Sequence, residues 1–118
     1  MGNPSLKLVT LREAYVTEFR SVAKVADIAP GEMKLVRLDG KELVVANADG
    51  EFFAFGNVCT HLGGPLEEGE LEGGTVTCPW HGAVFDIKTG QVVAEPAEDA
   101  IPTFEVRLFS DDIQVKIG

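Results

Sequence analysis

The sequence has little that would attach it to a membrane or direct it out of the cell. None of its hydrophobic runs approaches the roughly 18 consecutive apolar residues of a membrane-spanning helix. The segment from Met1 to Leu6 has neither the basic start nor the apolar core of a secretory signal. Leu6 also stands where a myristoylation signal would have Ser or Thr. We therefore expect a cytoplasmic protein that does not bind membranes.

Basic residues are scarce: the chain has 10 Lys and Arg against 19 Asp and Glu, a formal net charge of −9. Binding to nucleic acid depends on Lys and Arg that neutralise phosphates and release counterions, so we expect no nucleic-acid partner. An acidic surface instead favours basic protein partners and faster encounters with them. For most individual carboxylates the plainer interpretation, that they keep the protein soluble, is about as good.

Cysteine and histidine are equally rare, with two of each: Cys59, Cys78, His61 and His81. Two cysteines can form one disulfide, but a cytosolic protein is not expected to keep one. All four of these residues fall in two short stretches of the chain, one around residue 60 and one around residue 80.

The 118 residues suffice for one domain with a modest core. Short β-branched and aromatic runs alternate with Gly, Asp, Asn and Pro, and no window has a long 3.6-residue period. This pattern predicts an all-β fold, a sandwich or small barrel of about ten short strands. The segment 5–15 fits either a short helix or an edge strand. The expected strands are 19–25, 32–38, 41–46, 51–55, 75–77, 83–87, 91–93, 104–109 and 113–117, with hairpin turns at 39–40, 49–50, 88–90 and 110–112.

Each of the two stretches offers one thiolate and one imidazole. The first reads Cys59-Thr60-His61, and after sixteen intervening residues the second reads Cys78-Pro79-Trp80-His81. A lone Cys or His is commonly an ordinary core residue, but two matching pairs predict loops that converge on one metal centre. Soft thiolates with imidazoles suit either zinc or an iron–sulfur cluster. The spacing separates these only partly, because zinc sites usually pair Cys with Cys and His with His along the chain.

The two stretches closely resemble the cluster-binding loops of Rieske proteins, and the similarity extends over about 19–117. The resemblance implies a two-layer β-sandwich or small-barrel base with a cluster-binding loop subdomain at one end, and one [2Fe–2S] cluster. It implies that Cys59 and Cys78 ligate the buried iron, and that His61 and His81 ligate the outer iron through Nδ1. On this basis we expect a Rieske domain over 19–118, with cluster loops at about 57–86, and an N-terminal extension over 1–18.

Four residues near the proposed ligands differ from those of the high-potential Rieske proteins, and the differences indicate a low-potential member. Those members carry an extra Cys in each loop, where this chain has Gly64 and Trp80, and a Ser and a Tyr where this chain has Ala83 and Phe85. Fewer hydrogen bonds to sulfur leave the reduced cluster less stabilised, which lowers the potential within the family range of about −150 to +300 mV. The chain thus resembles the low-potential ferredoxins of bacterial aromatic-ring dioxygenase systems.

This resemblance implies an electron-transfer component and not an enzyme. Both histidines are already used, so none is left for an oxygen-activating mononuclear iron, and the sequence has no G-x-G-x-x-G nucleotide fingerprint. The implied partners are a flavin-containing reductase and a terminal oxygenase of aromatic-compound metabolism, and we expect the protein to be a monomer. The alternative is a small Rieske subunit of an assimilatory nitrite reductase, which would be a fixed component of an enzyme.

Residues around the ligands are expected to support them. Gly63, Gly64 and Gly82 leave room for backbone N–H groups to approach sulfur, although Gly64 fits an ordinary turn equally well. Trp80 and Phe85 shield the cluster or are simply core aromatics, and the segment 96–102 resembles the family's proline-bearing loop that covers one side. Four carboxylates, here called the acidic segment, form either a docking rim or a solvated run: Glu67, Glu68, Glu70 and Glu72.

Overall fold

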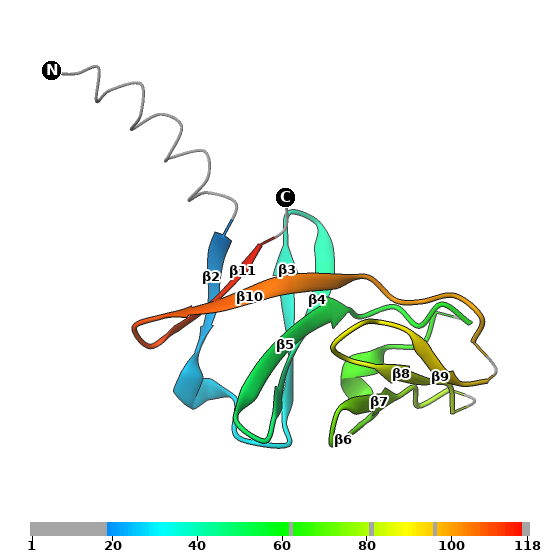
Figure 1. Ribbon diagram of the computed structural model, residues 1–118. Helices are drawn as coiled ribbons and strands as arrows, with labels where there is room; N and C mark the ends of the chain where they lie inside the picture. The colour runs from blue at the N-terminus through cyan, green and yellow to red at the C-terminus, as the bar shows by residue number, and fades with distance from the viewer. Residues whose placement is uncertain (1–18, 62, 81, 96, 117–118) are drawn as a thin grey trace, which may run out of the picture.

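The computed structural model describes residues 19–61, 63–80, 82–95 and 97–116 (Figure 1). The expected N-terminal extension, with its helix or edge strand at 5–15, lies outside these residues. Within the described ranges, no helix is both long enough and apolar enough to cross a membrane. The elements of the described part are, in order, β2 (Phe19–Lys24), η1 (Val25–Asp27), β3 (Met33–Leu38), β4 (Lys41–Ala48), β5 (Glu51–Gly56), η2 (Leu66–Glu68), β6 (Glu70–Glu72), β7 (Thr75–Thr77), β8 (Val84–Asp86), β9 (Val92–Ala94), β10 (Thr103–Phe109) and β11 (Asp112–Lys116).

The strands form two antiparallel sheets, which confirms the predicted all-β class. The larger sheet has six strands in the order β2-β11-β10-β5-β4-β3 and curves into a nearly closed barrel. The smaller sheet has four strands in the order β6-β7-β8-β9 and lies beside the barrel (Figure 1). The chain leaves the barrel after β5, builds the small sheet, and returns to the barrel as β10. This single excursion contains all four candidate ligands.

Tight turns set the register of the barrel strands. Asp39 and Gly40 join β3 to β4 with φ of 51° and 80°, and Asp49 and Gly50 join β4 to β5 with φ of 56° and 96°. Two consecutive residues with positive φ match the twist of an antiparallel hairpin, and Asp-Gly tolerates them. Both hairpins were predicted from these dipeptides, and both are confirmed. The hairpins predicted at 88–90 and 110–112 also form, as β8–β9 and β10–β11.

One strand of the small sheet was not predicted. β6 (Glu70–Glu72) pairs with β7, with Leu71 opposite Val76. Its sequence has one apolar residue between two carboxylates, which as a local pattern resembles a solvated charge run. The strand forms because β7 offers it a pairing edge and because Leu71 packs against the core beneath the small sheet.

Strand β4 packs on both of its faces and so joins the core of the barrel to the core of the small sheet. Leu43, Val44, Val45 and Ala46 are all buried, although side chains of a strand point alternately to opposite faces. Leu43 and Val45 pack inside the barrel, whereas Val44 and Ala46 pack in a second cluster that also contains Cys59 and Cys78. A strand buried on both faces reads as a continuous hydrophobic run. The two candidate cysteine ligands are therefore anchored on the outer face of the barrel wall.

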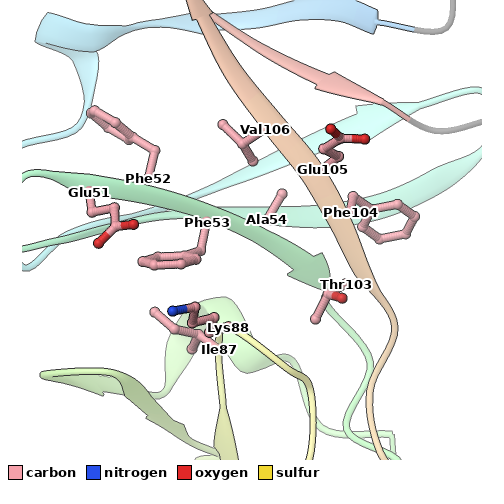
Figure 2. A pocket seen from close by; sticks show the side chains of 10 residues that line it. All are labelled: Glu51, Phe52, Phe53, Ala54, Ile87, Lys88, Thr103, Phe104, Glu105 and Val106. Atoms are coloured by element: carbon pink, nitrogen blue, oxygen red, sulfur yellow. The ribbon is translucent and has the colours of Figure 1, made fainter.

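The seam between barrel and small sheet opens into a cleft of about 320 Å³ (Figure 2). It lies where β10 parts from β5 after only two register pairs, and Phe53 there faces Ile87 and Lys88 of the β8–β9 region. None of the three candidate ligands that the structure describes lines this cleft. The candidate ligands belong instead to the segments between β5 and η2 and between β7 and β8.

Candidate metal centre

The first candidate ligand loop follows β5 and closes on itself. The backbone N–H of Cys59 donates to the carbonyl of Gly64 at 2.9 Å, and that of Gly63 donates back to the carbonyl of Cys59 at 2.8 Å. Val58 and Pro65 form a β-bridge below these bonds. Gly63 has φ of +81°, which a side chain would disfavour. The loop thus holds Cys59 buried, with Thr60 and His61 partly exposed.

The second candidate loop connects β7 to β8 and is shorter. The N–H of Cys78 donates to the carbonyl of Ala83 at 2.8 Å, and Gly82 adopts a φ of +78°. The backbone N–H of Trp80 donates to the Sγ atom of Cys78 at 3.4 Å. His81 lies outside the described residues, so its expected role as a ligand stays a prediction.

The two loops bring their cysteines together in the core. Each cysteine is about 2% exposed, and both are free thiols. Burial raises the pKa of the Cys78 thiol, the Trp80 N–H opposes this shift, and the neighbouring Cys59 thiol adds to it. Two adjacent buried thiols do not readily ionise together unless a cation compensates their charge, as a bound metal does. The pair is therefore suited to metal binding.

The space around the sulfur atoms supports the same conclusion. A Cβ added to Gly64 would lie 2.7 Å from Sγ of Cys78 and 3.0 Å from Cγ of Trp80. Only glycine permits this approach, so the sequence-based alternative of an ordinary turn glycine is insufficient for Gly64. The two aromatic residues differ in exposure: Phe85 is fully buried in the core cluster that contains both cysteines, whereas Trp80 is 48% exposed.

His61 is the described imidazole of the site. The residue is partly exposed, and its Nδ1 atom is shielded from solvent. The predicted coordination through Nδ1 requires an inward-facing nitrogen of this kind. Among the described residues, no three Cys, His, Asp or Glu side chains gather closely enough to hold a single metal ion. Two buried thiols, a shielded imidazole nitrogen and a glycine cradle are nevertheless the donor types of a mixed-ligand [2Fe–2S] cluster, in which the thiolates and the imidazoles bind different irons.

A third loop closes the site from the side of β10. The hydroxyl of Thr60 donates to the carbonyl of Asp99 at 2.6 Å, and the N–H of Gly56 donates to the carbonyl of Pro102 at 3.0 Å. Ala97 and Ile101 of this loop are buried in the same cluster as the cysteines. The segment predicted to cover one side of the site is thus in place from 97 onward, while residue 96 lies outside the described residues. The role of Thr60 was not predicted, because its partner is 39 residues away.

The acidic segment surrounds η2 and β6. Glu68, Glu70 and Glu72 are exposed, but Glu67 is partly buried, and its backbone N–H donates to the Oδ1 atom of Asn57 at 2.8 Å. The segment is therefore not a uniform solvated run. Asn57 itself was not singled out from the sequence, since a single Asn between a strand and a loop usually indicates only a turn.

Comparison with known sequences identifies the family. The profile described as "Rieske [2Fe-2S] domain" matches residues 18–105. Apoptosis-inducing factor 3 of Homo sapiens is 38% identical over 96 residues, but these cover 81% of this chain and only 16% of that protein. The ferredoxin component of biphenyl 2,3-dioxygenase of Rhodococcus jostii is also 38% identical over 96 residues, which cover 81% of this chain and 90% of that protein. The chain thus spans a small part of the first relative and nearly all of the second.

Solved structures agree. The Sphingomonas yanoikuyae B1 ferredoxin superposes with a TM-score of 0.80 at 33% identity, covering 84% of this chain and 98% of that one. A chain from the complex of reduced oxygenase and oxidized ferredoxin in carbazole 1,9a-dioxygenase also gives a TM-score of 0.80, at 30% identity, covering 83% and 92%. Relatives of this size are named as ferredoxins and not as oxygenases, which supports the expectation of an electron carrier rather than an enzyme. The chain belongs to the Rieske [2Fe–2S] domain family and holds one [2Fe–2S] cluster.

Proposed function

We propose that Cys59, Cys78, His61 and His81 are the ligands of this cluster, within a functional domain over 19–118. The adjacency of the two buried thiols supports the assignment most directly. Cys59 and Cys78 would hold the inner iron, within the core. His61 and His81 would hold the outer iron, nearer the surface.

We further propose that the chain is a one-electron carrier that takes electrons from a flavin-containing reductase and passes them to a terminal oxygenase of aromatic-compound metabolism. When bound, a Rieske cluster accepts and releases one electron at a time. The carrier role is supported by relatives of the same size that are named as ferredoxin components. We place it in the cytoplasm as a monomer.

The protein's own residues prepare the site for this role. The three loops bury the sulfur atoms and keep water from them, and the Trp80 N–H donates to Sγ of Cys78. Ala83 and Phe85 are fully buried and offer no hydroxyl to the sulfur atoms. We therefore expect a potential in the lower part of the family range. The half-exposed Trp80 ring beside Cys78 offers an apolar contact point for a partner.

The charge of the cluster-bearing half favours a basic partner surface. Residues 57–102 contain eight acidic residues and one basic residue, a net charge of −7 within the chain's total of −9. Docking near the ligands would therefore be steered by long-range attraction to a positive surface, and added salt would weaken that attraction.

The function is tested by titration and by partner capture. Stepwise anaerobic reduction should require one electron per chain and give a Rieske-type EPR signal. The tagged chain, expressed in its native host, should capture a flavoprotein reductase and an oxygenase when cross-linked, and only weakly when not. Capture of a stable complex with a sirohaem protein would favour the nitrite reductase subunit instead. A colourless protein that retains zinc would overturn both hypotheses.

A further inference from the structure

The described core contains two buried polar side chains, and both are asparagines. Asn47 is 4% exposed and Asn57 is 3% exposed. A buried amide is costly unless its donors and acceptors are satisfied, so a buried asparagine generally has a defined hydrogen-bonding role. Asn47 lies within β4, next to the turn of the β4–β5 hairpin, whereas Asn57 directly follows β5 and comes two residues before Cys59.

Asn57 connects strand β4 with both ends of the first ligand loop. Its backbone N–H donates to the carbonyl of Glu42 at 3.1 Å, and its Nδ2 donates to the Oε1 atom of Glu42 at 3.1 Å. Its carbonyl accepts from the N–H of Leu66 at 2.8 Å, and its Oδ1 accepts from the N–H of Glu67 at 2.8 Å. Every polar group of the residue is thus used.

These bonds fix the ends of the segment that contains Cys59 and His61. Asn57 begins that segment, and Glu67 ends it ten residues later. Glu42 precedes Leu43 and Val44, whose side chains lie in the two core clusters, so its backbone belongs to a strand that is packed on both faces, although its own side chain is 39% exposed. The Oε2 atom of Glu42 is also held, by Arg37 at 3.2 Å.

We propose that Asn57 is a positioning residue for the metal centre: its carboxamide fixes the first ligand loop, and with it Cys59 and His61, against the Glu42 end of β4. The inference rests on the proposed ligand assignment for its consequence at the iron, but the fixing of the loop is a property of the chain itself. A carboxamide is required because one side chain must both donate to a carboxylate and accept from a backbone N–H.

Asn47 provides a matched control. Its Nδ2 donates to the carbonyl of Ile28 at 2.8 Å, and its Oδ1 accepts from the N–H of Gly50 at 2.7 Å. It has the same residue type, the same burial and the same donor and acceptor usage, but it organises the β4–β5 turn, which bears no ligand. Replacing either residue by Leu approximately preserves the side-chain volume and the net charge, and it removes the side-chain hydrogen bonds while leaving the backbone ones.

The first experiment compares Asn57→Leu with Asn47→Leu in the cluster-loaded protein. Both should lower the melting temperature. Only Asn57→Leu should shift the reduced-state EPR spectrum and the midpoint potential, and it should accelerate amide hydrogen exchange across 57–67 by about tenfold or more, as expected for the loss of buried hydrogen bonds. If Asn57→Leu loses stability but keeps the wild-type EPR spectrum, potential and loop exchange, the residue is merely structural and the proposal is wrong.

A second pair of variants covers the case in which Asn57→Leu does not fold. Asn57→Asp alone places two carboxylates side by side and should loosen the loop. Combining it with Glu42→Gln restores the total charge and lets the introduced carboxamide donate to the introduced carboxylate, while that carboxylate still accepts from the N–H of Glu67. Loop exchange and the EPR spectrum should return toward wild type in the double variant. Equal loop exchange in single variant, double variant and wild type would overturn the proposal.

The exchange measurement also separates this proposal from the ligand assignment. Absence of a Rieske EPR signal from the wild-type protein would refute the ligand assignment. Unchanged exchange across 57–67 in the Asn57 variants would refute the positioning role, whether or not the ligands are correct.

Discussion

Replacement of Gly64 by Ala tests the packing between the two ligand loops. The added Cβ would lie 2.7 Å from Sγ of Cys78, 3.0 Å from Cγ of Trp80 and 3.1 Å from its Cδ2. Non-bonded carbon contacts are optimal at about 3.5–4.0 Å, so one loop must retreat by roughly 1 Å. The Cys59–Gly64 hydrogen bond of 2.9 Å opposes movement of the first loop, and the Cys78–Ala83 bond of 2.8 Å opposes movement of the second.

Overpacking of this kind costs about 1–3 kcal/mol. For a domain of this size the corresponding drop in melting temperature is about 4–20 °C. Because the displaced atom is a proposed ligand sulfur, we also expect lower iron content per chain and an altered EPR spectrum. Melting is followed by the loss of visible absorbance at a fixed heating rate, and iron is measured on the purified protein.

Gly74 supplies the control, because its backbone φ is not positive and an added Cβ would meet nothing within 4 Å. Gly74→Ala should change the stability by no more than about 0.5 kcal/mol. If Gly64→Ala matches Gly74→Ala and the wild type in melting temperature, iron content and EPR spectrum, the close packing of the two loops is not what holds the sulfur atoms in place.

Three further predictions concern the ligands, the potential and docking. His61→Ala or His81→Ala should abolish the Rieske spectrum, because the chain has no other histidine to replace the ligand; an unchanged EPR spectrum in either variant would refute the assignment. Ala83→Ser and Phe85→Tyr should each raise the midpoint potential by on the order of tens of millivolts where the new hydroxyl reaches a sulfur atom, and voltammetry showing a wild-type value near the top of the family range would contradict the low-potential class. Reduction by the reductase should slow as salt rises, since the Debye length falls from about 10 Å at 0.1 M to about 3 Å at 1 M. Neutralising the acidic segment should flatten that dependence in stopped-flow measurements, whereas a wild-type rate and salt slope would place docking elsewhere.

Local features of the fold were predictable because their causes are local. Asp39-Gly40 and Asp49-Gly50 indicated hairpins, since positive φ at two adjacent residues is a property of the dipeptide itself. The β6 strand was missed for the opposite reason. Its three residues have little intrinsic preference for a strand, and only the edge of β7 and the core contact of Leu71 select one.

The candidate site also has features that were predictable from the sequence and features that were not. Which residues could bind metal was evident from the chain, because the only two cysteines and two histidines occur in matching pairs. The contacts of Thr60 with Asp99 and of Asn57 with Glu42 were not evident, because they join residues 39 and 15 positions apart. Such contacts depend on which strands pack together, and no short window of sequence contains that information.

The sequence by itself determined the all-β class, the main hairpins and the chemical types of the candidate ligands. Each of these depends on backbone preference or side-chain chemistry within a few residues. Only the tertiary structure decided that Cys59 and Cys78 meet in the core on the outer face of β4, that Gly64 must lack a side chain to let them meet, and that a third loop closes over the first. The physical reason is that burial and close approach are properties of the packed chain, since each is created by atoms distant in sequence that exclude water together.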